Sequence, residues 1–270
     1  MSGRTLRVLY SPANMTPSFR FRVFVLPLLL IAGNAAQGRP ANSHGRLVLQ
    51  SDPKDIRDIF LTVPAPQNAD DLFSDVIGDL TQRKRALVSP DFAKGKSVLD
   101  IPNGYLKIDV TRSGTGSAAG RHGVLVLTSF TKRNRDRLVV LQMQNLTDYP
   151  DPVATDYFYR LSAGIYNETS ASDCLPPISF FAEFWGEQPE PAKAARDFVK
   201  VRGDSEFYSI EWPRNGTIAR AKCVIPYSDT DSPEMDRVRK ALAQHQYKSI
   251  ELIWDKDKGG FVKGAKSRSL

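Results

Sequence analysis

The chain has 270 residues, of which 41% are hydrophobic, 25% charged and 10% aromatic. This composition is that of a globular protein, and it excludes a disordered, collagen-like or multi-span membrane chain. A chain of this length can bury a core without a metal or a dense disulfide framework. The formal net charge of +7 raises the question of a nucleic-acid partner, and the answer depends on where the charge lies.

The N-terminal region predicts export. Residues 23–32 are apolar and follow Arg20 and Arg22, and small residues come directly after them. A membrane-spanning helix needs about 20 apolar residues, so this shorter stretch favours a secretory signal peptide over residues 1–36. Met15 offers a second translation start with a basic region of the usual length. We therefore expect a periplasmic or secreted protein with no stable membrane insertion after cleavage.

Removal of the signal peptide changes the charge argument. The segment carries four arginines and no acidic residue, so the formal charge falls from +7 to +3. Such a charge, spread over a domain, is too small for a phosphate-binding footprint, and we expect no nucleic-acid partner. Basic residues are dense in the tail over residues 256–268, and this pattern is typical of a solvated segment. The alternative is a contact for an anionic lipid, glycan or protein.

Cys174 and Cys223 are the two cysteines of the chain. In an exported protein an even pair predicts a disulfide, here closing a loop of 49 residues. On the chain-entropy model such a bond stabilises the fold by about 4 kcal/mol. The sequence therefore predicts a structural disulfide between these two residues.

The predicted elements begin after a polar linker over residues 37–50. Asp52, followed by Pro53, predicts a helix cap and a short helix to about Ile59. Asn68 can cap a second helix. Its apolar residues recur at the spacing of one buried helical face, namely Leu72, Phe73, Val76, Ile77 and Leu80.

From residue 98 onward the apolar pattern has the period of a strand. Residues 98–101 and 105–110 flank an Asn-Gly turn, which predicts a hairpin. Residues 123–130 are apolar on both faces, as in a central strand covered on both sides, and residues 138–143 are their natural antiparallel partner. Two further strands are expected over residues 157–166 and 178–185.

The C-terminal part predicts two more hairpins and two helices. One hairpin joins residues 206–212 and 217–225 through a second Asn-Gly turn, and the other joins residues 248–254 and 261–263. Helices are expected at residues 191–199 and after the cap at Ser232. The pattern therefore predicts an α+β fold, mainly an antiparallel sheet built from hairpins with three to four short helices packed on it. We expect one domain over residues 51–270.

Most motifs that suggest a cofactor site lack the neighbouring elements or ligand spacing that such a site needs. The glycine-rich loop at residues 114–120 precedes a strand rather than a helix, so it does not predict a phosphate cradle. The histidines His44, His122 and His245 are too scattered for a zinc site. We expect no cofactor and no metal.

One group of acidic and aromatic residues carries a functional hypothesis. Glu183 stands between Phe181 and Trp185 in a predicted strand, and Glu211 precedes Trp212. Two carboxylates beside aromatic rings are typical of glycoside hydrolysis, so Glu183 and Glu211 are candidate catalytic residues. The alternative is a non-catalytic surface in which Phe181, Trp185 and Trp212 bind sugar or protein.

Three functions remain open on the sequence alone. The favoured one is an exported, non-enzymatic binding protein of the bacterial envelope with an unknown protein or glycan partner, for example an inhibitor or immunity-type protein. A cell-wall or polysaccharide hydrolase predicts that Glu183 and Glu211 line one cleft. A structural accessory of an envelope assembly predicts oligomers or association with membrane machinery.

Overall fold

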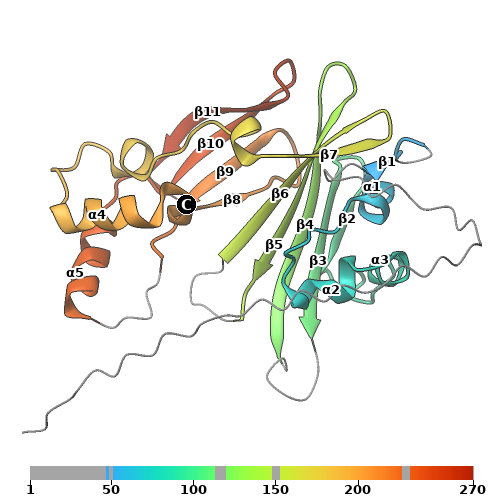
Figure 1. Cartoon of the computed structure of the whole chain (residues 1–270), viewed down its shortest axis with the longest axis horizontal. Helices are drawn as coiled ribbons and strands as arrows, with labels where there is room; N and C mark the ends of the chain where they lie inside the picture. The colour runs from blue at the N-terminus through green and yellow to red at the C-terminus, as the bar shows by residue number, and fades with distance from the viewer. Residues whose placement is uncertain (1–46, 49–50, 113–119, 148–152, 227–231, 270) are drawn as a thin grey trace, which may run out of the picture. The chain divides into compact units, whose positions relative to one another are not determined.

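The computed structural model describes residues 47–48, 51–112, 120–147, 153–226 and 232–269. The chain divides into two compact units, residues 1–41 and 42–270, and every described residue belongs to the second. The predicted signal peptide, most of the linker, His44 and most of the glycine-rich loop lie outside the described residues. The second unit contains two antiparallel sheets with short helices (Figure 1), which confirms the predicted α+β class.

The larger sheet has seven strands, all antiparallel to their neighbours. The hairpin predicted around the first Asn-Gly turn is confirmed, and Gly104 has the positive φ of 63° that such a turn requires. In spatial order the strands are β1 (Leu47–Val48), β7 (Ile165–Thr169), β6 (Val153–Ser162), β5 (Arg137–Asn145), β4 (Arg121–Thr131), β3 (Tyr105–Arg112) and β2 (Val98–Asp100).

The smaller sheet has four strands and contains both predicted C-terminal hairpins. Its spatial order is β11 (Gly260–Ser267), β10 (Ser249–Asp255), β9 (Ile218–Cys223) and β8 (Tyr208–Glu211), so β11 and β8 form the edges. We call the face that carries Ile250, Leu252 and Trp254 the inner face, because these residues belong to the core. The opposite face, which carries Ser249 and Glu251, is the outer face.

Three short helices cover one face of the larger sheet. They are α1 (Ile56–Thr62), α2 (Asp71–Ile77) and α3 (Leu80–Leu87). Their N-caps are Asp55, Asp70 and Asp79, not the predicted Asp52 and Asn68, because each of these aspartates accepts hydrogen bonds from the first turn. The predicted second helix is split: α2 ends at Ile77, and a capping box of Asp79 and Gln82 starts α3. The described residues therefore hold five α-helices rather than three to four.

Arg83 of α3 ties this helical layer together. Its side chain is buried and donates to the carbonyl oxygens of Phe60 (2.8 Å), Val63 (2.6 Å) and Ile77 (3.0 and 2.8 Å). These carbonyls lie at the C-terminal ends of α1 and α2, where intrahelical partners run out and the helix dipole is negative. The buried cation thus stabilises the ends of two helices at once.

The other face of the larger sheet packs against an aromatic core shared with the smaller sheet. This core also takes in α4 (Lys193–Arg202), α5 (Pro233–Leu242), the π-helical turn η2 (Phe181–Trp185) and the 3-10 turn η3 (Asp204–Phe207). A further 3-10 turn, η1 (Ala171–Asp173), precedes Cys174. Because both faces of the larger sheet are covered, β4 is buried along most of its length, as predicted.

Two predicted strands have a different structure. Residues 157–166 do not form one strand, because Ala163 and Gly164 adopt positive φ angles of 47° and 72° and turn the chain from β6 into β7. Residues 178–185 contain the π-helical turn η2 instead of a strand. Phe180, Phe184 and Trp185 bury their rings in the aromatic core. A short, mostly apolar segment does not by itself distinguish a buried strand from a buried helical turn.

The predicted disulfide is wrong, because Cys174 and Cys223 are both free thiols. The Cys174 carbonyl accepts a hydrogen bond from the amide of Phe261, which stands opposite Trp254 near the end of β10. The Cys223 amide donates to the carbonyl of Lys248, which directly precedes the start of β10. Lys248 and Trp254 are six residues apart along the strand, which is about 20 Å at ~3.3 Å per residue. A disulfide needs Cα atoms within about 7 Å.

Candidate functional site

The aromatic residues predicted to form a binding surface belong to the core. Trp185 and Trp212 are 6% and 4% exposed, and the Phe181 ring packs on Trp185 with centroids 5.9 Å apart. The indole N–H of Trp212 donates to Asp156 (2.8 Å), and that of Trp185 donates to the Pro189 carbonyl (3.1 Å). Because both indoles are buried with their polar atoms already bonded, the structure corrects the predicted surface of Phe181, Trp185 and Trp212.

Glu183 is held as a charged group in the π-helical turn η2. Its carboxylate accepts a hydrogen bond from Lys263 and forms an ion pair with Lys266 at 3.1 Å. Burial alone would raise the pKa of Glu183, but the bonds from the two lysines outweigh burial, and the pKa lies below its usual value. A carboxylate held ionised in this way is a poor general acid at neutral pH.

Glu211 lies far from Glu183. It is on the outer face of the smaller sheet at edge strand β8, where its half-exposed side chain pairs with Lys222 at 3.0 Å. Glu183 instead meets Lys263, which shares the inner face with Leu252 on the opposite edge strand, β11. The two carboxylates therefore lie on opposite faces and at opposite edges. The structure does not assemble the pair that the hydrolase hypothesis required.

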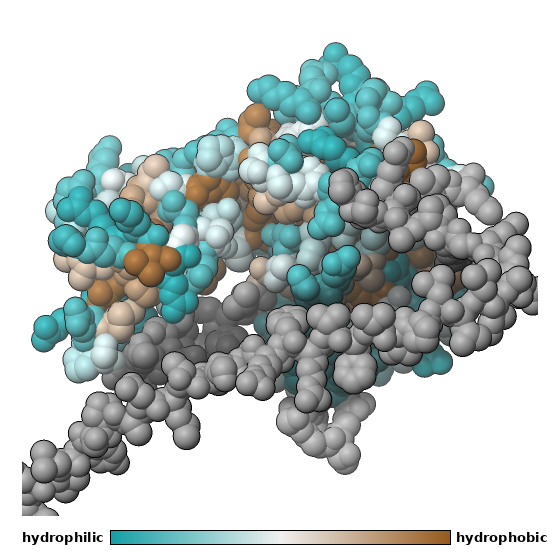
Figure 2. Space-filling model, viewed as in Figure 1, coloured by the Kyte–Doolittle hydropathy of each residue, from teal (hydrophilic) through white to brown (hydrophobic). Residues whose placement is uncertain are grey.

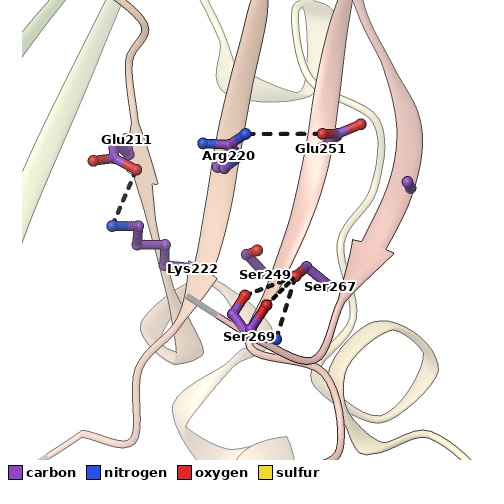
Figure 3. Close-up of a pocket in the computed structure, with 8 residues that line it drawn as sticks. Glu211, Arg220, Lys222, Ser249, Glu251, Ser267 and Ser269 are labelled. Atoms are coloured by element: carbon purple, nitrogen blue, oxygen red, sulfur yellow. Dashed lines mark hydrogen bonds and ion pairs between the residues drawn. The ribbon is translucent and has the colours of Figure 1, made fainter.

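The outer face of the smaller sheet holds a shallow polar depression of about 480 Å³, and it is the candidate functional site. Figure 3 shows its lining side chains rising from all four strands and from the segment after β11. Strand pairing explains the layout, because directly opposed residues in antiparallel strands share a face. The lining residues are Glu211, Arg220, Lys222, Ser249, Glu251, Ala265, Ser267 and Ser269.

Charges of opposite sign alternate across this face. Arg220 stands opposite both Glu211 on β8 and Glu251 on β10, and it approaches Glu251 at 4.0 Å (Figure 3). Lys222 pairs diagonally with Glu211. The side chains of Arg220 and Glu211 are 57% and 54% exposed, so these ion pairs are screened by water and individually weak. They can exchange for charged groups of a partner at small cost.

Among the residues that the structure describes, exposed large hydrophobic side chains do not gather at this site. They are scattered over the two ends of α3, the turn after β2, α4 and β9, and the face seen in Figure 2 is mainly hydrophilic, with hydrophobic residues in small separate areas. The residues concerned are Leu80, Val88, Ile101, Val201 and Ile218. Of these, Ile218 alone belongs to the smaller sheet. A ligand of the depression would therefore be recognised by charge and hydrogen bonds.

A second notable group, Asp156 of β6, lies between the sheets and was missed by the sequence analysis. Its Oδ1 accepts from Trp212 Nε1 (2.8 Å) and from Gln142 Nε2 (3.0 Å), and Gln142 also donates to the Ile210 carbonyl (2.8 Å). Burial raises the pKa of Asp156 to about 6 despite these two hydrogen bonds. An alternating strand pattern that predicts a core position could have drawn attention to the acid there.

The two described histidines lie on separate elements, His122 in β4 and His245 in the segment after α5. His122 of β4 contacts the Asp109 carboxylate through Nε2 at 3.1 Å. His245 follows α5, contacts the Leu242 carbonyl at 3.0 Å, and has a pKa lowered by burial. Across the described ranges, no group of three or more His, Cys, Asp or Glu side chains could hold a metal ion. Nor do these ranges contain a helix with the length and apolar character needed to cross a bilayer.

Comparison with known proteins gives little further information. No family model and no curated protein matches the sequence. Among solved structures, the chain is similar to a domain of an uncharacterized protein from Porphyromonas gingivalis W83, with 11% sequence identity and a TM-score of 0.45. The similarity covers 78% of this chain and 98% of that domain.

Proposed function

We propose that this chain is an exported, non-enzymatic binding protein of the bacterial envelope that engages a protein partner through the outer face of its smaller sheet. The observation that carries the proposal is the polar depression on that face. The apolar stretch after Arg20 and Arg22 supports export to the periplasm or outside the cell. The disulfide no longer supports it, because both cysteines are free.

The charge pattern of the depression favours a protein partner over a purely anionic ligand. Arg220 and Lys222 supply two positive charges, and Glu211 and Glu251 supply two negative ones, so the lining is close to neutral. A surface of alternating sign selects a partner with the complementary alternation and repels a partner in the wrong register. An inhibitor or immunity-type protein is one form of this function that fits such a contact.

The proposal is tested by capturing the protein partner on the wild-type chain and on charge-reversal variants. The intact chain is produced in the periplasm, immobilised, exposed to envelope extract, and compared with the double variant Arg220→Glu/Lys222→Glu. We expect one stoichiometric protein that the double variant loses. The control is Arg133→Glu, which reverses an 81% exposed side chain paired with Asp257 outside the depression and should retain the partner.

Two outcomes would overturn the proposal. Capture of the same protein by the double variant would move the contact away from the outer face. Failure of the wild-type chain to retain any protein would remove the binding function itself. Export is tested separately by fusing residues 1–36 to alkaline phosphatase, which is active only after translocation.

A further inference from the structure

A row of cations lies on the inner side of edge strand β11. Lys263 stands opposite Leu252 and Lys266 stands opposite Ile250, so three residue steps on β11 match two on β10. This is a β-bulge, and it places Lys266 on the same face as Lys263 instead of the opposite one. Arg268, two residues after Lys266, also reaches this side, because its guanidinium and the Lys266 ammonium contact the same ring, that of Tyr247.

Gly264 makes the bulge possible. A Cβ atom at this position would lie 2.8 Å from Cδ1 of Ile253 and 3.0 Å from Cβ of Glu251, closer than packed carbon atoms approach. The sequence therefore has glycine where the chain shifts register. The shift collects cations that would otherwise point to both faces of the sheet.

The buried carboxylate below this row neutralises only part of its charge. Glu183 is shared by Lys263 and Lys266, whose side chains are each 35% exposed. Each ammonium can donate three hydrogen bonds; Lys266 also donates to the Ala182 carbonyl (2.8 Å) and keeps one donor for another acceptor, whereas Lys263 keeps two. Among the described acidic side chains none forms an ion pair with Arg268. The group of Lys263, Lys266, Arg268 and Glu183, which we call the β11 cation row, carries a net charge of +2.

The surroundings of the β11 cation row add positive charge. The ring of Tyr247 adjoins the row, because the Lys266 ammonium and the Arg268 guanidinium are each 5.5 Å from its centre, and Lys248 is the next residue in the chain. Residues 237–268 contain nine Lys or Arg and three Asp or Glu, so the excess is a property of this part of the chain. Exposed cations beside an aromatic ring form a surface suited to carboxylates.

We propose that the β11 cation row is a second binding surface, for an extended acidic segment of a protein. Because of the bulge, Lys263 and Lys266 are two strand steps of β10 apart, about 7 Å at ~3.3 Å per residue, and Arg268 follows two residues later. Carboxylates on alternate residues of an extended peptide repeat every ~7 Å along one line, the spacing at which such a row can be paired. A lipid surface would instead be matched by cations spread over a plane, and the row is a single line along one edge.

The test uses hexaglutamate as probe and titration calorimetry on the intact chain at low salt. Lys263→Gln/Lys266→Gln should weaken hexaglutamate binding at least tenfold. Lys256→Gln/Lys258→Gln removes the same charge from the turn between β10 and β11 and should weaken it less than twofold. Equal loss in the two double variants would overturn the proposal, because binding would then follow net charge alone.

A second pair of variants tests the role of the buried acid. Glu183→Gln releases both lysines and should tighten hexaglutamate binding about threefold, whereas Glu251→Gln changes the net charge equally on the outer face and should leave it unchanged. Thermal unfolding of each variant confirms that it is folded. Vesicles with phosphatidylglycerol and a DNA duplex are tested in parallel, and tighter binding of either with the same lysine dependence would overturn the assignment to an acidic peptide.

The two surfaces are tested independently. Capture of the protein partner is expected to depend on Arg220 and Lys222 of the outer face, and hexaglutamate binding on Lys263 and Lys266. Lys263→Gln/Lys266→Gln leaves the outer face unchanged and Arg220→Glu/Lys222→Glu leaves the β11 cation row unchanged, so failure of one proposal is visible while the other is measured.

Discussion

The two faces of the larger sheet are buried by different means. On the helix-covered face the core is mainly aliphatic, and its buried charge is the guanidinium of Arg83, which is satisfied by carbonyl oxygens of two helices. On the other face the core is rich in aromatic rings and holds two carboxyl groups: Glu183 is kept ionised by Lys263 and Lys266, and Asp156 has a pKa raised to about 6. The guanidinium of Arg83 and the paired Glu183 stay charged at neutral pH, so we expect Asp156 to be the group whose titration changes the stability there.

The largest effect is expected from Phe130, whose ring lies within 6.0 Å, centre to centre, of Trp212, Trp254 and Phe261. Phe130→Ala should lower the free energy of unfolding by about 4 kcal/mol, because it opens a cavity among buried rings. All three tryptophans of the chain belong to this core, so urea unfolding followed by their fluorescence reports on it. Phe130→Leu should retain most of the stability, and equal losses would contradict the cavity argument.

Arg83→Met should cost about 3 kcal/mol, because it leaves the carbonyls of Phe60, Val63 and Ile77 without their donor while filling similar space. The measurement is urea unfolding followed by far-UV circular dichroism, compared with tryptophan fluorescence. Arg83→Lys is the control: it retains the charge but lacks the planar fork, and should fall between the wild type and Met. A Met variant as stable as the wild type would show that the helical layer does not depend on this cation.

Asp156→Asn should stabilise the protein by about 2 kcal/mol at pH 8 and change little at pH 4. In the folded protein the pKa of Asp156 is raised to about 6, so its contribution is fully present below the unfolded pKa and is lost as the pH rises through 6. Asparagine keeps an Oδ1 acceptor for Trp212 and Gln142 without the charge. Urea midpoints of both proteins from pH 4 to pH 8 give the difference, and a gain independent of pH would contradict this account.

Asp79→Ala should cost about 1 kcal/mol, because it removes the side chain that accepts from the Gln82 amide at the start of α3. The measurement is again urea unfolding by circular dichroism. Gln82→Ala removes only the returning half of the capping box and should cost less. The reverse order would show that the reciprocal bond, rather than the cap itself, starts the helix.

Local signals in the sequence predict the fold better than they predict the site. Both Asn-Gly turns lie between paired strands, and Ser232 caps α5, because these residues act through their own backbone or the next turn. Phe180, Phe184 and Trp185 were misassigned because their conformation depends on partners distant in the sequence. The distance between Cys174 and Cys223 likewise depends on the order of the strands, which the cysteine count does not reveal.

The candidate site depends even more on long-range pairing. Glu211 was selected as a candidate catalytic acid, but its partner Lys222 follows from the register of β8 and β9. Glu183 was selected for its aromatic neighbours, whereas its chemistry is set by Lys263 and Lys266, which lie some 80 residues later. No local pattern joins these positions, so the sequence suggested a pair of acids where the fold pairs each acid with lysines.

The two free thiols provide a built-in reporter of local opening. Burial raises the pKa of Cys174 and raises that of Cys223 to about 12, so neither reacts readily with an alkylating reagent while its surroundings stay closed. They stand near opposite ends of β10, about 20 Å apart. The labelling rate of each cysteine, followed by mass spectrometry, would therefore measure how often its own end of the smaller sheet opens, without any introduced probe.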